Sequence, residues 1–413
     1  MIIRIKPQNI MCFILAYMMN FQGISTAVLN VVAIWKIPVL TGLATPLLYA
    51  SFYACVIIGI FLLLTTKWKL DRLAVTAFFL LSVLVTLLIS QESKAYLWTS
   101  FADILRNPTY VFWLYSFSLF LFSGCVEDVQ MLKNMLEKLA YATVGLSLLY
   151  YIASVSNDDA PEYMTFSYNM LFSVTLLIIL WIQKFSWPRM IIGVVGAVLI
   201  FIAGCRGALL GLLISVVAYD WFGGSTRTQK QRLSRMLLVL LGLLAIIFWR
   251  NILEAIASIL DSLDISSRTI YLLLEDAFLE DSGRSQLLDT AVQKFSVVGH
   301  GLYGDRLALN GTYIHNVFVE LVFDYGMILG AGLALLWIIV ILVGATGTPA
   351  EYRLLICALL SVGCVKLFFS GSFLNQEPGV YLLLGLCLNG MRARKEHLRA
   401  ENSKAQLHRI GGT

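Results

Sequence analysis

Charged residues are scarce in this chain of 413 residues, because only 13% are Asp, Glu, Lys or Arg. A soluble domain carries about 25%. In their place, 59% of the residues are apolar. Apolar runs of roughly 17 residues or more recur, long enough to cross a bilayer core of about 30 Å. The scarcity of charge argues against a soluble domain and predicts an all-α polytopic membrane protein.

Paired cysteine motifs are absent as well. None of the seven cysteines forms a CxxC pair, and all lie in or beside apolar segments. This pattern argues against structural disulfides and against a zinc site. No small-residue cleavage site follows Arg4 and Lys6, so we expect a retained first span rather than a signal peptide.

Apolar segments predict about twelve spans. They lie near residues 10–35, 39–64, 73–90, 108–125, 138–154, 169–183, 189–204, 206–222, 236–249, 316–345, 352–373 and 378–390. With both termini inside, the inner segments hold 20 of the 30 basic residues, nine are outside, and Lys366 lies within a span. This bias follows the positive-inside rule. The net charge of +5 therefore reflects topology and does not indicate nucleic-acid binding.

The spans surround one sizeable polar segment. We divide the chain into N-terminal membrane helices (1–188), helices carrying Arg206 (189–249), a large outer loop (250–315), C-terminal membrane helices (316–390) and a basic cytoplasmic tail (391–413). The outer loop has its own helical patterns, one over 252–263 and one capped by Asp281 or Ser282. The apolar stripe of the second helix consists of Leu287, Leu288, Ala291, Val292 and Phe295. A glycine-rich turn, VVGHGLYGDR, follows. A long loop with internal structure is more often functional than a plain connection.

The most informative run is HNVFVELVFDYG, from His315 to Gly326. His315 lies where the outer loop enters an apolar helix. Asn316, Glu320 and Asp324 follow at a spacing of four, so they share one helix face. An acid at the centre of a span costs about 2.5–3.5 kcal/mol on insertion. This face must therefore line protein or a wet cavity.

Other candidates have ordinary structural explanations beside the functional ones. Arg206, in GCRGALLG, opens a span and can snorkel outward, while Arg284, in DSGRSQ, can be a solvated loop residue. His300, in GHG, is a second candidate base, ranked below His315. Arg268 and Arg306 are lesser candidates for phosphate or sugar contacts, and Lys366 is expected to pair with Glu320 or Asp324. An acidic patch is formed by Asp158, Asp159 and Glu162, for which a solvated loop is favoured over a metal site.

These motifs resemble the O-antigen polymerase and O-antigen ligase family of bacterial envelope glycosyltransferases. The resemblance covers about residues 189–345. It rests on Arg206 in CRGALLGLL, Arg284 in SGRSQLLDTAV, the turn VVGHGLYG, and HN followed nine residues later by Gly326. The ligase pattern continues G-x-x-[GTY], whereas here the next glycine, Gly330, is one place late. That departure favours the polymerase.

The resemblance implies a GT-C-like membrane enzyme. Such an enzyme moves a glycan from a polyprenyl diphosphate to a sugar hydroxyl on the outer face of the cytoplasmic membrane. Arg206 and Arg284 would hold the diphosphate, since the guanidinium fork suits phosphate oxygens. His315 would be the general base, kept neutral because nearby arginines lower its pKa. Asn316 would orient the histidine or the start of the helix. No metal or other cofactor is expected.

Two rival functions stay open. An O-antigen ligase would use the same donor but a lipid A–core acceptor. A flippase for lipid-linked sugars would place polar groups at the midplane, usually in related halves, whereas the polar cluster here lies at the outer rim and no repeat is seen. The expected partners are an undecaprenyl-diphosphate-linked oligosaccharide, membrane lipids and a chain-length regulator, with no nucleic acid.

Overall fold

The computed structural model describes residues 6–36, 38–66, 69–89, 112–157, 161–223, 254–255, 257–258, 262, 284–375 and 377–410. These residues form helices joined by turns and loops, with no strand among them, so the all-α prediction is confirmed. Seven of the described helices are long and apolar enough to cross a membrane, which supports the polytopic prediction without testing the count of twelve. The predicted span at 236–249 lies outside the described residues.

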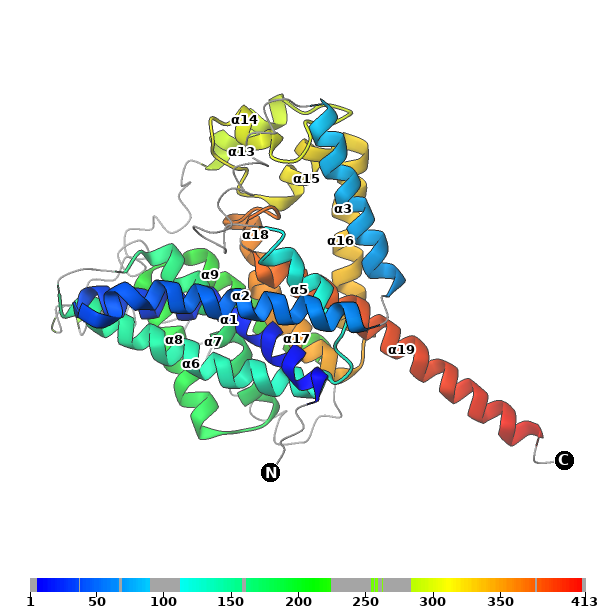
Figure 1. Ribbon diagram of the computed structural model, residues 1–413, viewed down its shortest axis with the longest axis horizontal. Helices are drawn as coiled ribbons and strands as arrows, with labels where there is room; N and C mark the ends of the chain where they lie inside the picture. The colour runs from blue at the N-terminus through cyan, green and yellow to red at the C-terminus, as the bar shows by residue number, and fades with distance from the viewer. Residues whose placement is uncertain are drawn as a thin grey trace.

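Most helices belong to one bundle, drawn in the lower half of Figure 1. Helix α1 packs along α6 and beside α2, while α7 packs against α8, α9 and α17. The bounds are α1 (Pro7–Ile34), α2 (Pro38–Thr65), α5 (Ser116–Ser123), α6 (Val129–Val155), α7 (Tyr163–Gln183), α8 (Trp187–Ala203), α9 (Arg206–Phe222) and α17 (Ala350–Leu360).

Three helices at the edge of the molecule expose apolar side chains. Only 22% of the most apolar window is buried in α2, α3 (Leu70–Ile89) and α16 (Met327–Gly347), against 72% in α7 and in the segment Ala350–Phe369. Phe61, Leu88 and Ile328 are among the exposed residues. Large exposed apolar surface needs an apolar environment. The outer faces of these helices therefore fit a lipid bilayer.

Two helices begin earlier than hydropathy predicted, because a polar residue caps the start of each one. The Asp128 side chain accepts a hydrogen bond from the Met131 amide, so α6 begins at Val129 rather than 138. Glu162 accepts from the amides of Met164 and Thr165, so α7 begins at Tyr163 rather than 169. An acidic residue at this position satisfies first-turn amides that have no partner within the helix. A polar first turn of this kind cannot be detected from the apolar pattern alone.

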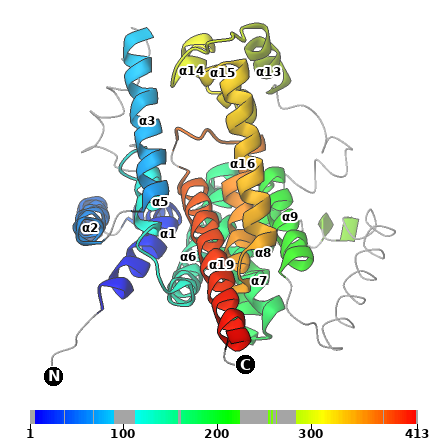
Figure 2. The same ribbon diagram turned by 90° about the vertical axis from the view of Figure 1, so that its right-hand side faces the viewer.

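A small helical cap stands at one end of the molecule. It consists of α13 (Arg284–Gln293), α14 (Gly304–Ala308) and α15 (Val317–Tyr325), and it lies beside the ends of α3 and α16 (Figures 1 and 2). Ala291, Leu309, Ile314 and Phe323 are buried together as its core. The predicted helix with an apolar stripe through Ala291 is therefore confirmed. We call α13–α15 and their connecting loops the cap.

The predicted continuous span from 316 to 345 is wrong. Gly326 interrupts it with φ 85° and ψ 165°, and α15 and α16 lie on either side of this break. Only glycine adopts this conformation readily. A Cβ at Gly326 would lie 2.2 Å from the carbonyl oxygen of Val297. The close approach packs the glycine-rich turn against the break and keeps Glu320 and Asp324 out of α16.

This break gives a stability prediction. We expect Gly326→Ala to lower the free energy of unfolding by at least about 2–3 kcal/mol, because the backbone conformation excludes a Cβ and the neighbouring atom is backbone. The control is Gly332→Ala in α16, where a Cβ would meet nothing within 4 Å. That change should leave stability unchanged or raise it by under about 1 kcal/mol. Thermal unfolding of both variants in detergent is the measurement, and equal melting temperatures would contradict the prediction.

The predicted span at 352–373 is found as three consecutive helical segments. After α17 come a π-helix (Ser361–Val365) and the short α18 (Lys366–Phe369). A π-turn inside a helix is rare and often marks a functional position, and here it immediately precedes Lys366. The last helix, α19 (Pro378–Ile410), runs well past the predicted end of its span at 390. Its far end and the start of α1 both point away from the cap (Figures 1 and 2).

Candidate functional site

His315 lies in the loop between α14 and α15, one residue before the cap residue of α15. Its imidazole is half-buried and rests against the ring of Tyr313, with 4.3 Å between ring centroids. The Nδ1 atom is buried and has no hydrogen-bond partner in the described structure. A buried nitrogen of this kind lacks a partner that a bound hydroxyl group can supply.

The electrostatic surroundings keep His315 neutral. Burial lowers its pKa below the usual value, and the positive charge of Arg284 lowers it further, while Asp305 opposes the shift. Both causes disfavour a second positive charge at this place. The prediction that a nearby arginine lowers this pKa is confirmed for Arg284. A neutral imidazole near pH 7 is able to accept a proton.

Arg284 and Arg206 each open a helix. Arg284 is the first residue of α13, and Arg206 is the first residue of α9 after its cap residue, Cys205. Burial raises the pKa of the Cys205 thiol, and the charge of Arg284 is among the effects that oppose this rise. Arg284 therefore lies near enough to act on both His315 and the start of α9. The amides of a helix N-terminus favour anions, and an arginine at each start adds charge.

Small residues beside Arg206 allow close packing. A Cβ on Gly207 would lie 2.2 Å from the hydroxyl oxygen of Tyr168 in α7. A Cβ on Gly211 would lie 3.1 Å from the Ser361 carbonyl oxygen at the start of the π-helix. Glycine is needed where helices approach this closely. The beginning of α9 is thus fixed against α7 and against the segment that leads to Lys366.

Asn316 forms the start of α15. Its side-chain oxygen accepts hydrogen bonds from the amides of Phe318 at 3.0 Å and Val319 at 3.3 Å. This is a helix N-cap, so the prediction that Asn316 orients the helix start is confirmed. The cap also fixes the backbone next to His315.

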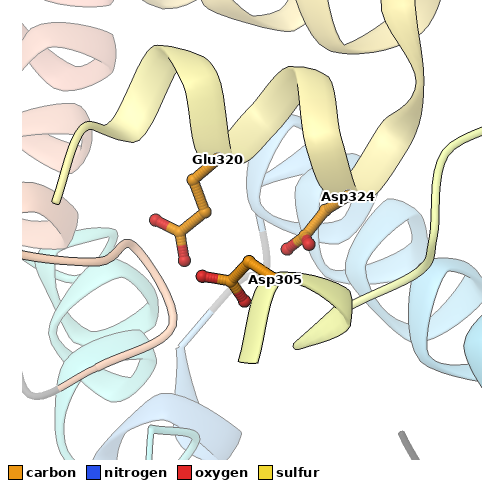
Figure 3. Close-up of side chains that lie close together, drawn as sticks. All are labelled: Asp305, Glu320 and Asp324. Atoms are coloured by element: carbon orange, nitrogen blue, oxygen red, sulfur yellow. The ribbon is translucent and has the colours of Figure 1, made fainter. Parts of the chain in front are cut away.

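Glu320 and Asp324 face the interior of the cap (Figure 3), where they meet Asp305 of α14. Arg306 Nη1 lies 2.9 Å from Asp305 Oδ1 and 3.6 Å from Glu320 Oε1. Glu320 also accepts hydrogen bonds from the Ser372 hydroxyl and the Phe373 amide. Burial raises the pKa of both Glu320 and Asp324, and the charge of Asp305 raises them further. The prediction of a polar face lining the protein interior holds, although this face belongs to the cap.

Two predicted roles need correction. Arg306 was a candidate for phosphate or sugar contacts, but it is buried, and its Nη2 donates to Ser372 at 3.0 Å and Asn375 at 2.7 Å. Its guanidinium holds the cap to the loop before α19. Lys366 does pair with an acid, but the acid is Glu377 at 2.8 Å rather than Glu320 or Asp324. A turn of chain after α18 brings Glu377 back onto Lys366, which the sequence spacing did not indicate.

The other candidate residues from the sequence have structural roles or lie outside the described residues. His300 stacks on Phe323, with 4.4 Å between centroids, and its Nε2 lies 2.8 Å from the Lys294 carbonyl oxygen. This packing gives His300 a structural place in the turn. Glu162 is the cap of α7. Arg268, Asp158 and Asp159 lie outside the described residues.

Sequence reasoning missed four polar residues of this region: Asp305, Ser372, Asn375 and Glu377. Asp305 lies within the predicted glycine-rich turn VVGHGLYGDR, which was the one available signal. Ser372, Asn375 and Glu377 lie in SGSFLNQEP, which contains turn-forming residues but no motif. Only the fold brings this loop against the cap.

The chain matches no protein-family model, no curated protein and no solved structure. Its function is therefore inferred from its residues and their geometry.

Proposed function

We propose that this protein is a membrane glycosyltransferase that polymerises a surface polysaccharide. It would transfer a glycan from a polyprenyl diphosphate to a sugar hydroxyl of a lipid-linked acceptor, without nucleotide. The observation that carries this proposal is the half-buried imidazole of His315, which has an unpartnered nitrogen and whose pKa is lowered by burial and by the charge of Arg284. A neutral base beside a fixed positive charge suits the attack of a hydroxyl on a phosphate-activated sugar.

The reaction needs both groups at the same time. His315 accepts the proton of the acceptor hydroxyl as its oxygen bonds to the anomeric carbon. The bond from that carbon to the phosphate oxygen breaks, and the diphosphate leaves with the electron pair. Negative charge then grows on the phosphate oxygens, where Arg284 and Arg206 stabilise it together with the first-turn amides of their helices. Preorganised charge of this kind is often the largest catalytic contribution.

The proposed orientation places the cap on the outer face of the cytoplasmic membrane and both termini inside. Two observations support it. The start of α1 and the end of α19 point away from the cap (Figures 1 and 2), and the predicted inner segments hold most of the basic residues. A polyprenyl-linked donor would then reach the arginines from the outer leaflet.

Cells that lack this protein test the function. We expect their surface glycan to lose the ladder of increasing polymer lengths and to retain single repeat units attached to the acceptor lipid. The readout is a glycan gel, with a plasmid-borne copy as the control. A normal ladder in the deletion strain would overturn the polymerase proposal.

The rival functions give other outcomes of the same experiment. Loss of a ligase would leave polymer on the polyprenyl carrier and none on lipid A–core. Loss of a flippase would leave single units on the inner face. One feature favours the flippase as a second candidate function. It is the Lys366–Glu377 ion pair beside the π-helix, with Lys366 Nζ 5.1 Å from the centroid of the Tyr168 ring. Charged pairs inside transport proteins often mark a substrate path.

A further inference from the structure

We propose that Asp305, Glu320 and Asp324 form a site for one divalent cation, with Ca²⁺ as the best fit. The cation would join α14 to α15 inside the cap. This site is separate from the arginines and the histidine of the proposed reaction, and its test does not depend on that reaction. The sequence predicted no metal, because Asp305 meets the other two residues only in the fold.

The spacing of the carboxylates suits a calcium ion. One oxygen from each residue lies within 4.8 Å of the others, and Figure 3 shows the three side chains directed toward one another from α14 and α15. Calcium binds oxygen at about 2.3–2.6 Å, so ligands on opposite sides are up to about 5 Å apart. Magnesium needs about 2.0–2.1 Å and a strict octahedron. Second carboxylate oxygens and water would complete the six to eight ligands that calcium takes.

Asp324 is the independent observation. Its side chain points into the cluster, it is only 3% exposed, and neither of its oxygens makes a hydrogen bond of normal geometry, although the Asp305 backbone amide lies close enough to favour the charged form. The other two acids are satisfied, because Asp305 accepts from Arg306 and from the Ile314 amide, and Glu320 accepts from Ser372 and Phe373. Leaving a buried carboxylate without a partner is strongly unfavourable. A cation bound among the three residues would remove this cost.

The charges lead to the same inference. Three carboxylates meet one guanidinium, that of Arg306, which is already held by Asp305, Ser372 and Asn375. The two positive charges of a divalent cation, added to that of Arg306, balance the three acids. A monovalent ion would leave one buried negative charge.

The site also reaches the loop that carries His315. Asp305 Oδ2 accepts a hydrogen bond from the Ile314 amide at 3.0 Å, and Ile314 is the neighbour of His315. On the other side, the Gly301 amide donates to the Asp324 carbonyl oxygen at 2.9 Å. A cation bridging Asp305 and Asp324 would therefore fix the glycine-rich turn and the histidine loop together.

The test is calcium binding to the purified full-length protein in a non-ionic detergent after removal of metals with a chelator. We expect one Ca²⁺ per chain by equilibrium dialysis and a melting temperature that rises by several degrees at saturating Ca²⁺. Asp324→Asn should weaken binding by more than about 100-fold, since loss of even an outer-shell partner costs about 10–100-fold. The matched control is Asp289→Asn, an exposed acid of α13, which should bind like the wild type.

The variant also guards against an unfolding artefact. Without metal, Asp324→Asn replaces a buried carboxyl group whose charged form is disfavoured, so its melting temperature should not fall below that of the metal-free wild type, and Ca²⁺ should no longer raise it. Metal-free wild type that neither binds Ca²⁺ nor changes its melting temperature would overturn the proposal. Unchanged binding by Asp324→Asn would overturn it as well. In either case the cluster would hold protons in place of a cation, and the proposed reaction would be unaffected.

Discussion

Replacing His315 by alanine should abolish chain growth while leaving the protein folded and its donor bound. A positioned general base contributes about 10²–10⁴-fold to a rate, and His315 is the histidine with a buried, unpartnered nitrogen in the described structure. Its role as a base is exerted in the transition state, so the donor should still bind to the arginines. The measurements are polymer length on a glycan gel and binding of donor lipid to the purified variant.

The matched control for His315→Ala is His397→Ala. The His397 side chain is 72% exposed in the tail part of α19, the helix whose far end points away from the cap (Figure 1). This variant should make a normal ladder. A normal ladder from His315→Ala would show that the base lies elsewhere. Failure of that variant to bind donor would assign His315 to binding or folding instead of proton transfer.

Replacing Arg284 by glutamine should have two separable effects. A hydrogen bond to a charged group contributes about 1.5–3 kcal/mol, so loss of the guanidinium should weaken donor binding by about ten- to a hundredfold. It should also raise the pKa of His315, because the charge of Arg284 is one cause of the lowered value. His315 must be neutral to act, so activity falls as the pH drops through its pKa. The acidic limb of kcat/KM should therefore move to higher pH.

Arg206→Gln is the control for this second effect. The causes of the His315 shift are burial, Arg284 and Asp305, and Arg206 is not among them. Arg206→Gln should weaken donor binding but leave the acidic limb in place. Profiles of kcat/KM between about pH 5 and 8, a range centred on the usual histidine pKa of about 6.5, distinguish the two variants. Limbs that coincide in all three proteins would show that His315 is not the titrating base.

Sequence patterns predicted elements whose cause is local. Apolar runs predicted α1, α2 and α9 closely, because the length and composition of a span are set by the bilayer. The stripe through Ala291 predicted α13, and the position of Asn316 before an apolar run predicted a helix start. Each of these signals lies within a few residues of the element that it forms.

Contacts between distant segments were beyond the reach of these patterns. The partner of Lys366 was sought on another span, whereas Glu377 comes from a turn that hydropathy does not describe. Arg306 was assigned to phosphate or sugar contacts because its buried acids, Asp305 and Glu320, come together only when α14 packs on α15. The break at Gly326 was missed because a single glycine in an apolar run costs little in a helix, and only the approach of Val297 requires it.

The break at Gly326 has a consequence for how the chain is made. The segment that enters the membrane after it, Met327–Gly347, contains no charged residue, and its most apolar 18-residue window has a mean hydropathy of 2.7. The insertion machinery therefore handles an ordinary apolar helix, while Glu320 and Asp324 never have to enter the lipid. Ser372 and Phe373, which donate hydrogen bonds to Glu320, follow α16 in the chain. The polar contacts of the cap are therefore completed only by residues synthesised after α16.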